Sequence, residues 1–355
     1  MIKGWKWIGI VLLLAACNNS EDDTVYVPTP TSLDAPLLFQ QLLGEPQIPA
    51  DNPLTEEGIA LGQRLFFDRS LSADGTQSCA SCHSPEAAFS DNRQFSVGVT
   101  GALGRRNSMP IQNLAWNINT FNWDGSASSL EEQAFEPVTN PREMNNTWPN
   151  VVQTLESSAN YPRQFEEAFG TPGIDSVRVT KAISQFTRTL ISGNTRFDRF
   201  LLGEIELTPA ELNGFDVFMR EDKGDCFHCH GNENNPLWTD NDFHNNGLDE
   251  VITDRGLGAV TGDPREFGLF RTPSLRNLAY TAPYMHDGRF ETLEEVIDHY
   301  SEGLVFSETI DPLMKAVDQG GVQLSDEDKA DLKAFLLSLS DPEFIIPPPN
   351  PNQGN

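Results

Sequence analysis

The chain has 355 residues and carries 24 Lys and Arg against 52 Asp and Glu, which gives a formal net charge of −28. This length allows about two domains of roughly 150 residues, and the excess of negative charge disfavours binding to nucleic acids and to anionic lipid surfaces. Hydrophobic residues make up 38% of the chain, which argues against general disorder, and no apolar run after the N-terminus approaches the about 20 residues of a membrane span.

The first residues have the pattern of an export signal. Lys3 and Lys6 precede an apolar stretch at 8–14, and Leu-Ala-Ala then leads to Cys17. Such a pattern is typical of a cleaved signal peptide, here residues 1–16. A cysteine directly after small residues resembles the lipobox of bacterial lipoproteins, so Cys17 is expected to be lipidated; a free cysteine is the alternative. The sequence predicts an exported protein, periplasmic or on the cell surface, which contacts a membrane only through this lipid anchor.

Beyond the signal, the sequence predicts mainly helices. Residues 17–34 are polar and include two prolines, which predicts a flexible tether from the lipid. Apolar residues recur at helical spacing in four segments, at 56–67, 179–191, 208–219 and 325–337. Alternating strand patterns are scarce, and the proline-rich residues 346–355 are expected to form a disordered tail. We therefore expect a mainly α protein with long loops.

Apart from Cys17, every cysteine belongs to a C-x-x-C-H motif. Two C-x-x-C pairs could form disulfides or a zinc site, but a histidine directly after each pair is the signature of c-type haem attachment. Two thioether bonds would hold each haem on one helical turn, with the histidine as the axial ligand of the iron. The sequence therefore predicts two c-type haems. Their attachment and axial residues are Cys79, Cys82, His83, Cys226, Cys229 and His230.

The two motifs stand in similar surroundings, since each follows a helical segment that ends near a phenylalanine-rich turn, at 61–67 and at 214–219. This parallel predicts two cytochrome c-like domains with one haem each. We assign residues 35–202 to the N-terminal domain and residues 203–345 to the C-terminal domain.

Several segments resemble the bacterial di-haem cytochrome c peroxidases and the related MauG enzymes, which oxidise tryptophans of a partner protein. These segments are LGQRLFFDRSLSADGTQSCASCH, GRRNSMPIQN, NWDGSASSLEEQA, NPREM, TPSLRN and TAPYMHDGRFETLEEVIDHY. The resemblance covers about residues 50–340. It implies an oxidoreductase that reduces hydrogen peroxide to water at the first haem, with electrons that enter at the second haem from a small cytochrome c or cupredoxin.

The resemblance also implies which residues surround the peroxide. Glu143 in NPREM and Gln133 in LEEQA match the distal glutamate and glutamine of the family. Cleavage of the peroxide bond needs a group that moves a proton from one oxygen to the other, and a partly desolvated glutamate suits this task. Trp123 matches the tryptophan that the family places between the two haems as an electron bridge. We therefore expect these three side chains to act in catalysis.

One loop departs from the peroxidases that need reductive priming. Those members carry a removable histidine ligand in a Ser-Ile-Gly-His-like sequence, whereas this chain has Ser-Val-Gly-Val at 96–99 and no histidine between His83 and His228. Valine cannot bind iron, so the first haem is expected to be open in the ferric protein, without reductive activation. A rearranged loop that brings another ligand is the alternative.

The resemblance places the distal ligand of the second haem at Tyr300, where MauG-like members have tyrosine and most peroxidases have methionine. A capping box at Thr292 begins a helix whose apolar face includes Ile297 and Tyr300. Core packing is the other interpretation of Tyr300, and Met285 and His299 remain alternative ligands. A phenolate ligand would stabilise ferric iron and lower the reduction potential.

A calcium ion is also implied by the resemblance, because Asn107, Thr281 and Pro283 match the positions whose oxygens bind it between the domains. Carbonyl and amide oxygens suit this cation.

Two further functions stay open. A MauG-like oxidase that modifies a partner protein is favoured by Val99 and Tyr300, but Gly224 stands where MauG has the tryptophan that relays oxidation to its substrate. A non-enzymatic electron carrier would have no use for Glu143. The negative charge predicts a basic docking face on the electron donor, and a homodimer is one option for the assembly.

Overall fold

The computed structural model describes residue 1, residues 26–349 and Asn352. Apart from Met1, the predicted signal peptide lies outside these residues, as do Cys17 and part of the predicted tether and tail. In the part of the chain that is described, no helix is both long enough and apolar enough to span a membrane.

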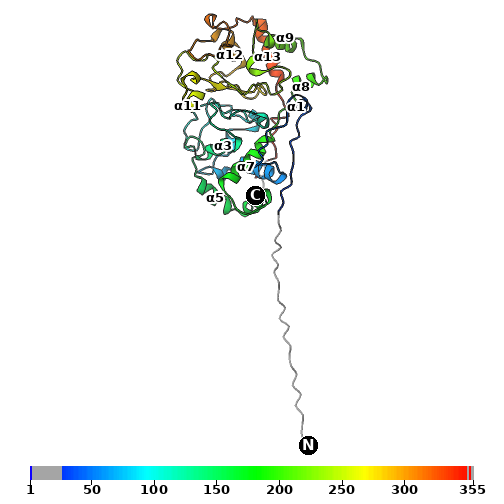
Figure 1. Ribbon diagram of the computed structural model, residues 1–355, viewed down its shortest axis with the longest axis vertical. Helices are drawn as coiled ribbons and strands as arrows, with labels where there is room; N and C mark the ends of the chain where they lie inside the picture. Colours follow the sequence, from blue (N-terminus) through cyan, green and yellow to red (C-terminus); the bar gives the residue numbers. More distant parts are fainter. Residues whose placement is uncertain (2–25, 350–351, 353–355) are drawn as a thin grey trace.

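The described chain is mainly helical, with long loops and one two-stranded sheet (Figure 1), as the sequence predicts. Its α-helices are α1 (Leu37–Leu42), α2 (Glu56–Phe66), α3 (Leu130–Gln133), α4 (Glu136–Thr139), α5 (Trp148–Glu156), α6 (Tyr161–Phe169), α7 (Ser176–Arg188), α8 (Arg196–Leu201), α9 (Pro209–Met219), α10 (Phe227–His230), α11 (Leu257–Thr261), α12 (Leu293–Asp298) and α13 (Asp326–Ser338). Strand β1 (Phe243–His244) pairs antiparallel with β2 (Phe270–Arg271).

Side-chain caps fix where the predicted helices begin. The hydroxyl of Thr55 accepts a hydrogen bond from the Gly58 amide at the start of α2. Thr208 and Glu211 form a capping box at the start of α9, and α12 has the predicted box at Thr292. A capping side chain satisfies a backbone N–H that has no partner within the helix. The residues that begin these helices could therefore be predicted from the sequence.

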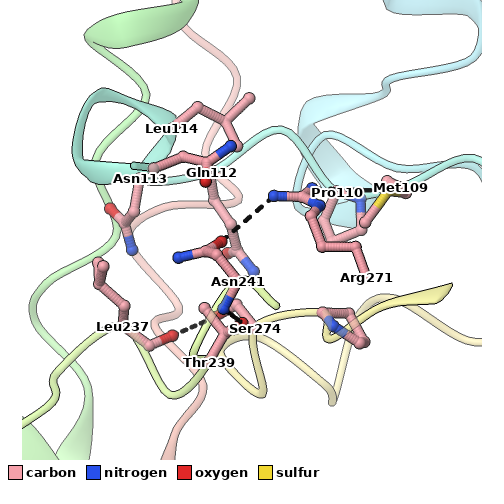
Figure 2. Close-up of a pocket in the computed structure, with 12 residues that line it drawn as sticks. Met109, Pro110, Gln112, Asn113, Leu114, Leu237, Thr239, Asn241, Arg271 and Ser274 are labelled. Carbon is pink, nitrogen blue, oxygen red and sulfur yellow. Dashed lines mark hydrogen bonds between the residues drawn. The ribbon is translucent and has the colours of Figure 1, made fainter. Parts of the chain in front are cut away.

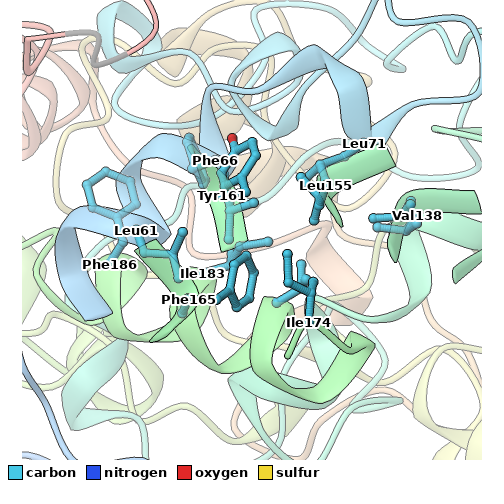
Figure 3. Close-up of a cluster of buried hydrophobic side chains, with 14 of the residues drawn as sticks. Leu61, Phe66, Leu71, Val138, Leu155, Tyr161, Phe165, Ile174, Ile183 and Phe186 are labelled. Atoms are coloured by element: carbon cyan, nitrogen blue, oxygen red, sulfur yellow. The ribbon is translucent and has the colours of Figure 1, made fainter. Parts of the chain in front are cut away.

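Two hydrophobic clusters organise the molecule. One is built from α2, α5, α6 and α7 and includes Phe66, Phe165 and Phe186 (Figure 3), in the lower half of Figure 1. The other joins α8, α9, α12 and α13 around Trp238 and Phe335 in the upper half.

The two clusters share one packing device. The helix before each C-x-x-C-H motif has a glycine pressed against the backbone of a second helix. A Cβ on Gly62 of α2 would lie 1.9 Å from the Ala182 carbonyl oxygen of α7, and one on Gly214 of α9 would lie 1.9 Å from the Asp331 oxygen of α13. Only glycine allows so close an approach of two helices.

Buried polar contacts join the two halves. The side-chain amide of Asn277 donates to Ser192 Oγ at 2.9 Å and to Gln112 Oε1 at 2.5 Å, and its Oδ1 accepts from the Asp341 amide at 2.8 Å. These residues come from segments far apart in the sequence, and each buried polar atom in the group finds a partner, as stability requires.

The described ends of the chain lie against this body. Residues 29–34, part of the predicted tether, include Thr29, whose hydroxyl donates to Glu57 at 2.8 Å, and Leu33, which packs in a small cluster with Phe39. At the other end, the Pro349 oxygen accepts from Gln63 of α2 at 3.0 Å. The predicted tether and tail therefore include residues that dock on the folded protein.

Candidate functional site

Each C-x-x-C-H motif forms one helical turn. The first is a 3-10 turn over Cys79–Ser81, after which the His83 amide donates to the Cys79 oxygen at 2.9 Å. The second is α10, where the His230 amide donates to the Cys226 oxygen at 3.1 Å. None of the four cysteines of the two motifs forms a disulfide. Both motifs thus place a histidine one turn beyond the first cysteine, as covalent haem attachment requires.

The protonation of the two histidines also suits iron binding. Burial lowers the pKa of His83, and lowers the pKa of His230 to about 4, so both imidazoles are neutral near pH 7. Nδ1 of His83 lies 3.0 Å from the Phe89 carbonyl oxygen, an arrangement that orients the ring and leaves Nε2 for a metal. Nδ1 of His230 is buried without a hydrogen-bond partner in the described chain. Two c-type haems therefore fit these residues.

Glu143 lies in the turn after α4, partly buried. Its Oε1 accepts a hydrogen bond from Asn140 Nδ2 at 2.7 Å, and the same nitrogen donates to Glu136 at 3.1 Å. Burial and the charge of Glu136 raise the pKa of Glu143 to about 7. The pKa values of Cys79 and Cys82 are also raised, mainly by burial. The negative charge of Glu143 contributes to both increases. The carboxyl therefore lies near the first C-x-x-C-H turn and exchanges protons near neutral pH.

Gln133 and Trp123 occupy different settings. Gln133 is the last residue of α3, shortly before α4, and makes no side-chain hydrogen bond in the described chain. Trp123 is buried, and its indole N–H donates to the Asn107 oxygen at 2.8 Å. Its own carbonyl accepts from the Arg271 amide at 2.9 Å. The Trp123 backbone and ring thus join segments from both halves of the molecule.

The loop that carries Val99 lies against the Glu143 turn. The Val99 amide donates to the Glu143 oxygen at 2.9 Å, and a Cβ on Gly98 would lie 2.1 Å from the Arg142 oxygen. Residues 96–104 include no imidazole, thiol, thioether, amine or phenol. This loop therefore supplies no common iron ligand beside Glu143.

The three alternative ligands for the second haem converge on Asn246. Its side-chain nitrogen donates to the Tyr300 hydroxyl at 3.0 Å and lies 3.5 Å from the Met285 sulfur. The backbone oxygen of Asn246 lies 3.1 Å from Nε2 of His299, so this nitrogen already has a hydrogen-bond partner. Tyr300 lies in a π-turn over His299–Gly303, directly after α12. The sequence does not predict this wider turn. It also does not single out Asn246, the residue that contacts all three side chains.

The Tyr300 hydroxyl also lies close to the second motif. Burial raises the pKa of Tyr300 to about 12, the hydrogen bond from Asn246 opposes this rise, and negative charge on Cys229 and Cys226 adds to it. A positive iron centre would have the opposite effect and favour the phenolate.

Replacing Tyr300 with phenylalanine is expected to raise the reduction potential of the second haem, because a phenolate ligand stabilises ferric iron. A spectroelectrochemical titration of the full di-haem protein measures this shift. The matched control is Tyr284→Phe, which removes a phenol that donates to the Leu278 oxygen at 2.7 Å in the same half. An unchanged ferric spectrum in Tyr300→Phe would mean that Tyr300 is not the ligand, and Met285→Leu should then change it.

The residues implied for calcium lie in two loops, and one of them, Asn107, accepts a hydrogen bond from Trp123. Asn107 and Thr281 are each less than a tenth exposed, and Pro283 is buried. The Asn107 amide donates to the His286 oxygen at 2.8 Å, which brings the two loops together.

Besides Asn246, the sequence analysis does not identify Arg271 as a functional residue, although Arg271 lies directly before the TPSLRN segment. Asn246 lies in a loop and Arg271 ends the short strand β2, and nothing in their immediate sequence distinguishes them. A buried arginine is the more informative of the two, because charged side chains are almost never fully buried without a partner.

Comparisons with known proteins agree on one family. A family model described as di-haem cytochrome c peroxidase matches residues 56–206. The methylamine utilization protein MauG of Methylorubrum extorquens is 40% identical over 311 residues, which cover 85% of this chain and 84% of that protein. The cytochrome c peroxidase Ccp of Escherichia coli is 35% identical over 301 residues, which cover 82% of this chain and 60% of that protein.

A solved structure gives the same result for the fold. The crystal structure of a MauG-like protein associated with microbial copper homeostasis has a TM-score of 0.82 and 37% sequence identity, and the match covers 90% of this chain and 99% of that one. Since sequence identity above 30% extends over more than four fifths of the chain, this protein belongs to the family of di-haem cytochrome c peroxidases and MauG.

Proposed function

We propose that this protein is a di-haem cytochrome c peroxidase that reduces hydrogen peroxide to water without reductive activation. The observation that carries the proposal is Glu143, a partly buried carboxyl with a pKa raised to about 7 near the first C-x-x-C-H turn. The neighbouring loop, with Val99, offers no residue that would block that site. Residues 35–202 are proposed to form the peroxide-reactive domain, and residues 203–345 the electron-transfer domain.

Bound haem would supply the redox-active iron, and the residues of this chain would manage the protons. Glu143 takes a proton from one peroxide oxygen and returns it to the other as that oxygen leaves as water. Asn140 holds the carboxyl through its hydrogen bond, and Gln133 is proposed to hydrogen-bond the peroxide. Each peroxide consumes two electrons and two protons and gives two molecules of water.

Electrons are proposed to enter at the haem of His230 and to pass by Trp123 to the haem of His83. The donor would be a small cytochrome c or cupredoxin with a basic face, since the chain carries a net charge of −28. Export, the lipid on Cys17, and calcium held by Asn107, Thr281 and Pro283 belong to the same proposal.

A MauG-like oxidation of a partner protein is the second candidate, favoured by Tyr300 in contact with Asn246 and by the 37% identity to the MauG-like protein associated with copper homeostasis. Gly224 argues against a MauG-type relay, because a Cβ there would lie 2.7 Å from the Val217 oxygen and 3.2 Å from Cys226 Sγ. A tryptophan does not fit at this position unless the backbone shifts.

The test is to add one equivalent of hydrogen peroxide to the fully ferric, unprimed protein and to follow the haem spectrum on the millisecond scale. We expect a rapid spectral change, followed by the oxidation of two equivalents of reduced cytochrome c per peroxide. Absence of any change until one haem has been reduced would contradict the open site.

The same experiment separates the two candidates. The MauG-like function would be favoured by two results together. Reduced cytochrome c would fail to return the peroxide-oxidised protein to its ferric spectrum, and the oxidised protein would instead oxidise tryptophan in a protein from the same cell. Mass spectrometry of that partner would detect the added oxygen or the cross-link.

A further inference from the structure

Arg271 is a buried cation without an anionic partner. Its side chain is 6% exposed. One guanidinium nitrogen donates to Asn241 Oδ1 at 3.2 Å, another lies 3.6 Å from the Met109 sulfur, and Nε has no partner. No carboxylate of the described chain lies within ion-pair distance. Arg276, which is equally buried, instead forms two hydrogen bonds with Asp198, at 2.7 and 2.8 Å.

This arrangement is unfavourable for the protein alone. A charged group taken out of water needs an opposite charge and hydrogen bonds to compensate for its lost hydration. Burial alone lowers the pKa of Arg271 to about 10, since no neighbouring carboxylate opposes the effect. The guanidinium therefore requires an anion that the described residues do not provide.

Arg271 lines a cavity between the two halves of the molecule (Figure 2), and the walls come from residues 109–117 and residues 237–274. In Figure 2 its guanidinium extends toward Asn241, beside Met109.

Residues at or next to the cavity wall contact both C-x-x-C-H motifs. Ser108, next to Met109, donates to the Cys82 oxygen at 2.9 Å, and its hydroxyl lies 3.3 Å from Nδ1 of His83. The backbone of Pro273, which lines the cavity, raises the pKa of His230. The cavity that Arg271 lines thus adjoins residues that contact both histidines.

We propose that the guanidinium of Arg271 binds a propionate carboxylate of one of the two haems and raises the reduction potential of that haem. A carboxylate can accept two parallel hydrogen bonds from Nε and a terminal nitrogen of one guanidinium. The pair neutralises a negative charge near the iron, and less negative charge favours the ferrous state. Either haem offers the same chemistry, and the test identifies which one is bound.

The test compares Arg271→Gln and Arg271→Lys with the unchanged full-length di-haem protein. Spectroelectrochemistry gives the midpoint of each haem, and resonance Raman spectroscopy follows the propionate bending bands. Arg271→Gln is expected to lower the midpoint of one haem and to shift its propionate band. Arg271→Lys keeps the charge, so its midpoint should fall less. The surface control is Arg265→Gln, which removes a side chain that is 88% exposed and should change neither measurement.

The haem whose midpoint moves is the one that Arg271 binds. Unchanged midpoints and bands in Arg271→Gln would overturn the proposal. If Arg271→Gln cannot be purified with both haems attached, Arg271→Lys is the deciding variant. A lysine cannot form the forked pair with a carboxylate, so the proposal predicts a shifted propionate band in Arg271→Lys. An unchanged band would overturn the proposal. Neither measurement uses peroxide, so its outcome is independent of whether the protein is a peroxidase.

Discussion

Glu143→Gln is expected to slow the reaction of the ferric protein with hydrogen peroxide by about 100- to 10,000-fold, the usual contribution of a general acid–base group. Glutamine preserves the shape of the side chain and can accept a hydrogen bond from Asn140, but it cannot take a proton from peroxide. Stopped-flow measurement of the rate constant, with both haems shown to be attached, tests this result. A rate within a few-fold of the unchanged protein would remove Glu143 from the mechanism.

The pH dependence of the same reaction provides an independent check. The carboxylate must accept the first proton, so the rate is expected to rise with pH through about 7, the raised pKa of Glu143. Glu136→Gln is the matched variant, since it removes a neighbouring negative charge and leaves Glu143 in place. Its profile should shift to lower pH, because the charge of Glu136 raises the pKa of Glu143. A profile that does not move would mean that another group titrates.

The raised pKa also predicts how Glu143 affects stability. A carboxyl whose pKa is higher in the folded state contributes stability below its unfolded value, and this contribution is lost as the pH rises through the folded value of about 7. The protein with Glu143 should therefore lose thermal stability relative to Glu143→Gln as the pH rises from about 4.5, the ordinary pKa of a glutamate, to about 7, and the difference should change little above that pH.

Val99→His is expected to block the reaction of the fully ferric protein with peroxide. The loop that holds Val99 is bonded to the Glu143 backbone, and an imidazole at this position corresponds to the removable ligand of the primed peroxidases. If the imidazole occupies the iron about 99% of the time, the reactive fraction falls to about 1% and the rate falls about 100-fold.

The measurement is again stopped-flow addition of peroxide, before and after reduction of one haem. Reduction should restore the reaction in Val99→His if the new ligand is released, as in the members that need priming. Val99→Leu controls for the change in side-chain size and should react like the unchanged protein. Equal rates for the two variants would mean that the loop does not face the peroxide-binding side of the first haem.

Much of this protein could be predicted from short stretches of sequence. The two C-x-x-C-H turns and the helix caps at Thr55, Thr208 and Thr292 depend on residues within about four positions of one another, so local spacing determines them. The same holds for the scarcity of strands. The π-turn at His299–Gly303 is an exception, because the α-helical pattern continues through it.

The remaining features depend on residues that only folding brings together. Asn246 reaches Tyr300 across 54 positions in the sequence, and Arg271 reaches Met109 across 162. The proton affinity of Glu143 depends on how deeply its turn is buried, which no motif specifies. The sequence by itself predicted the two C-x-x-C-H turns, the helices near 56–67, 179–191, 208–219 and 325–337 and after Thr292, and the family resemblance, since these rest on local spacing and residue type. Only the tertiary structure decided which polar groups lie beside those sites and which of them lack a partner, because burial and charge compensation are properties of the packed chain.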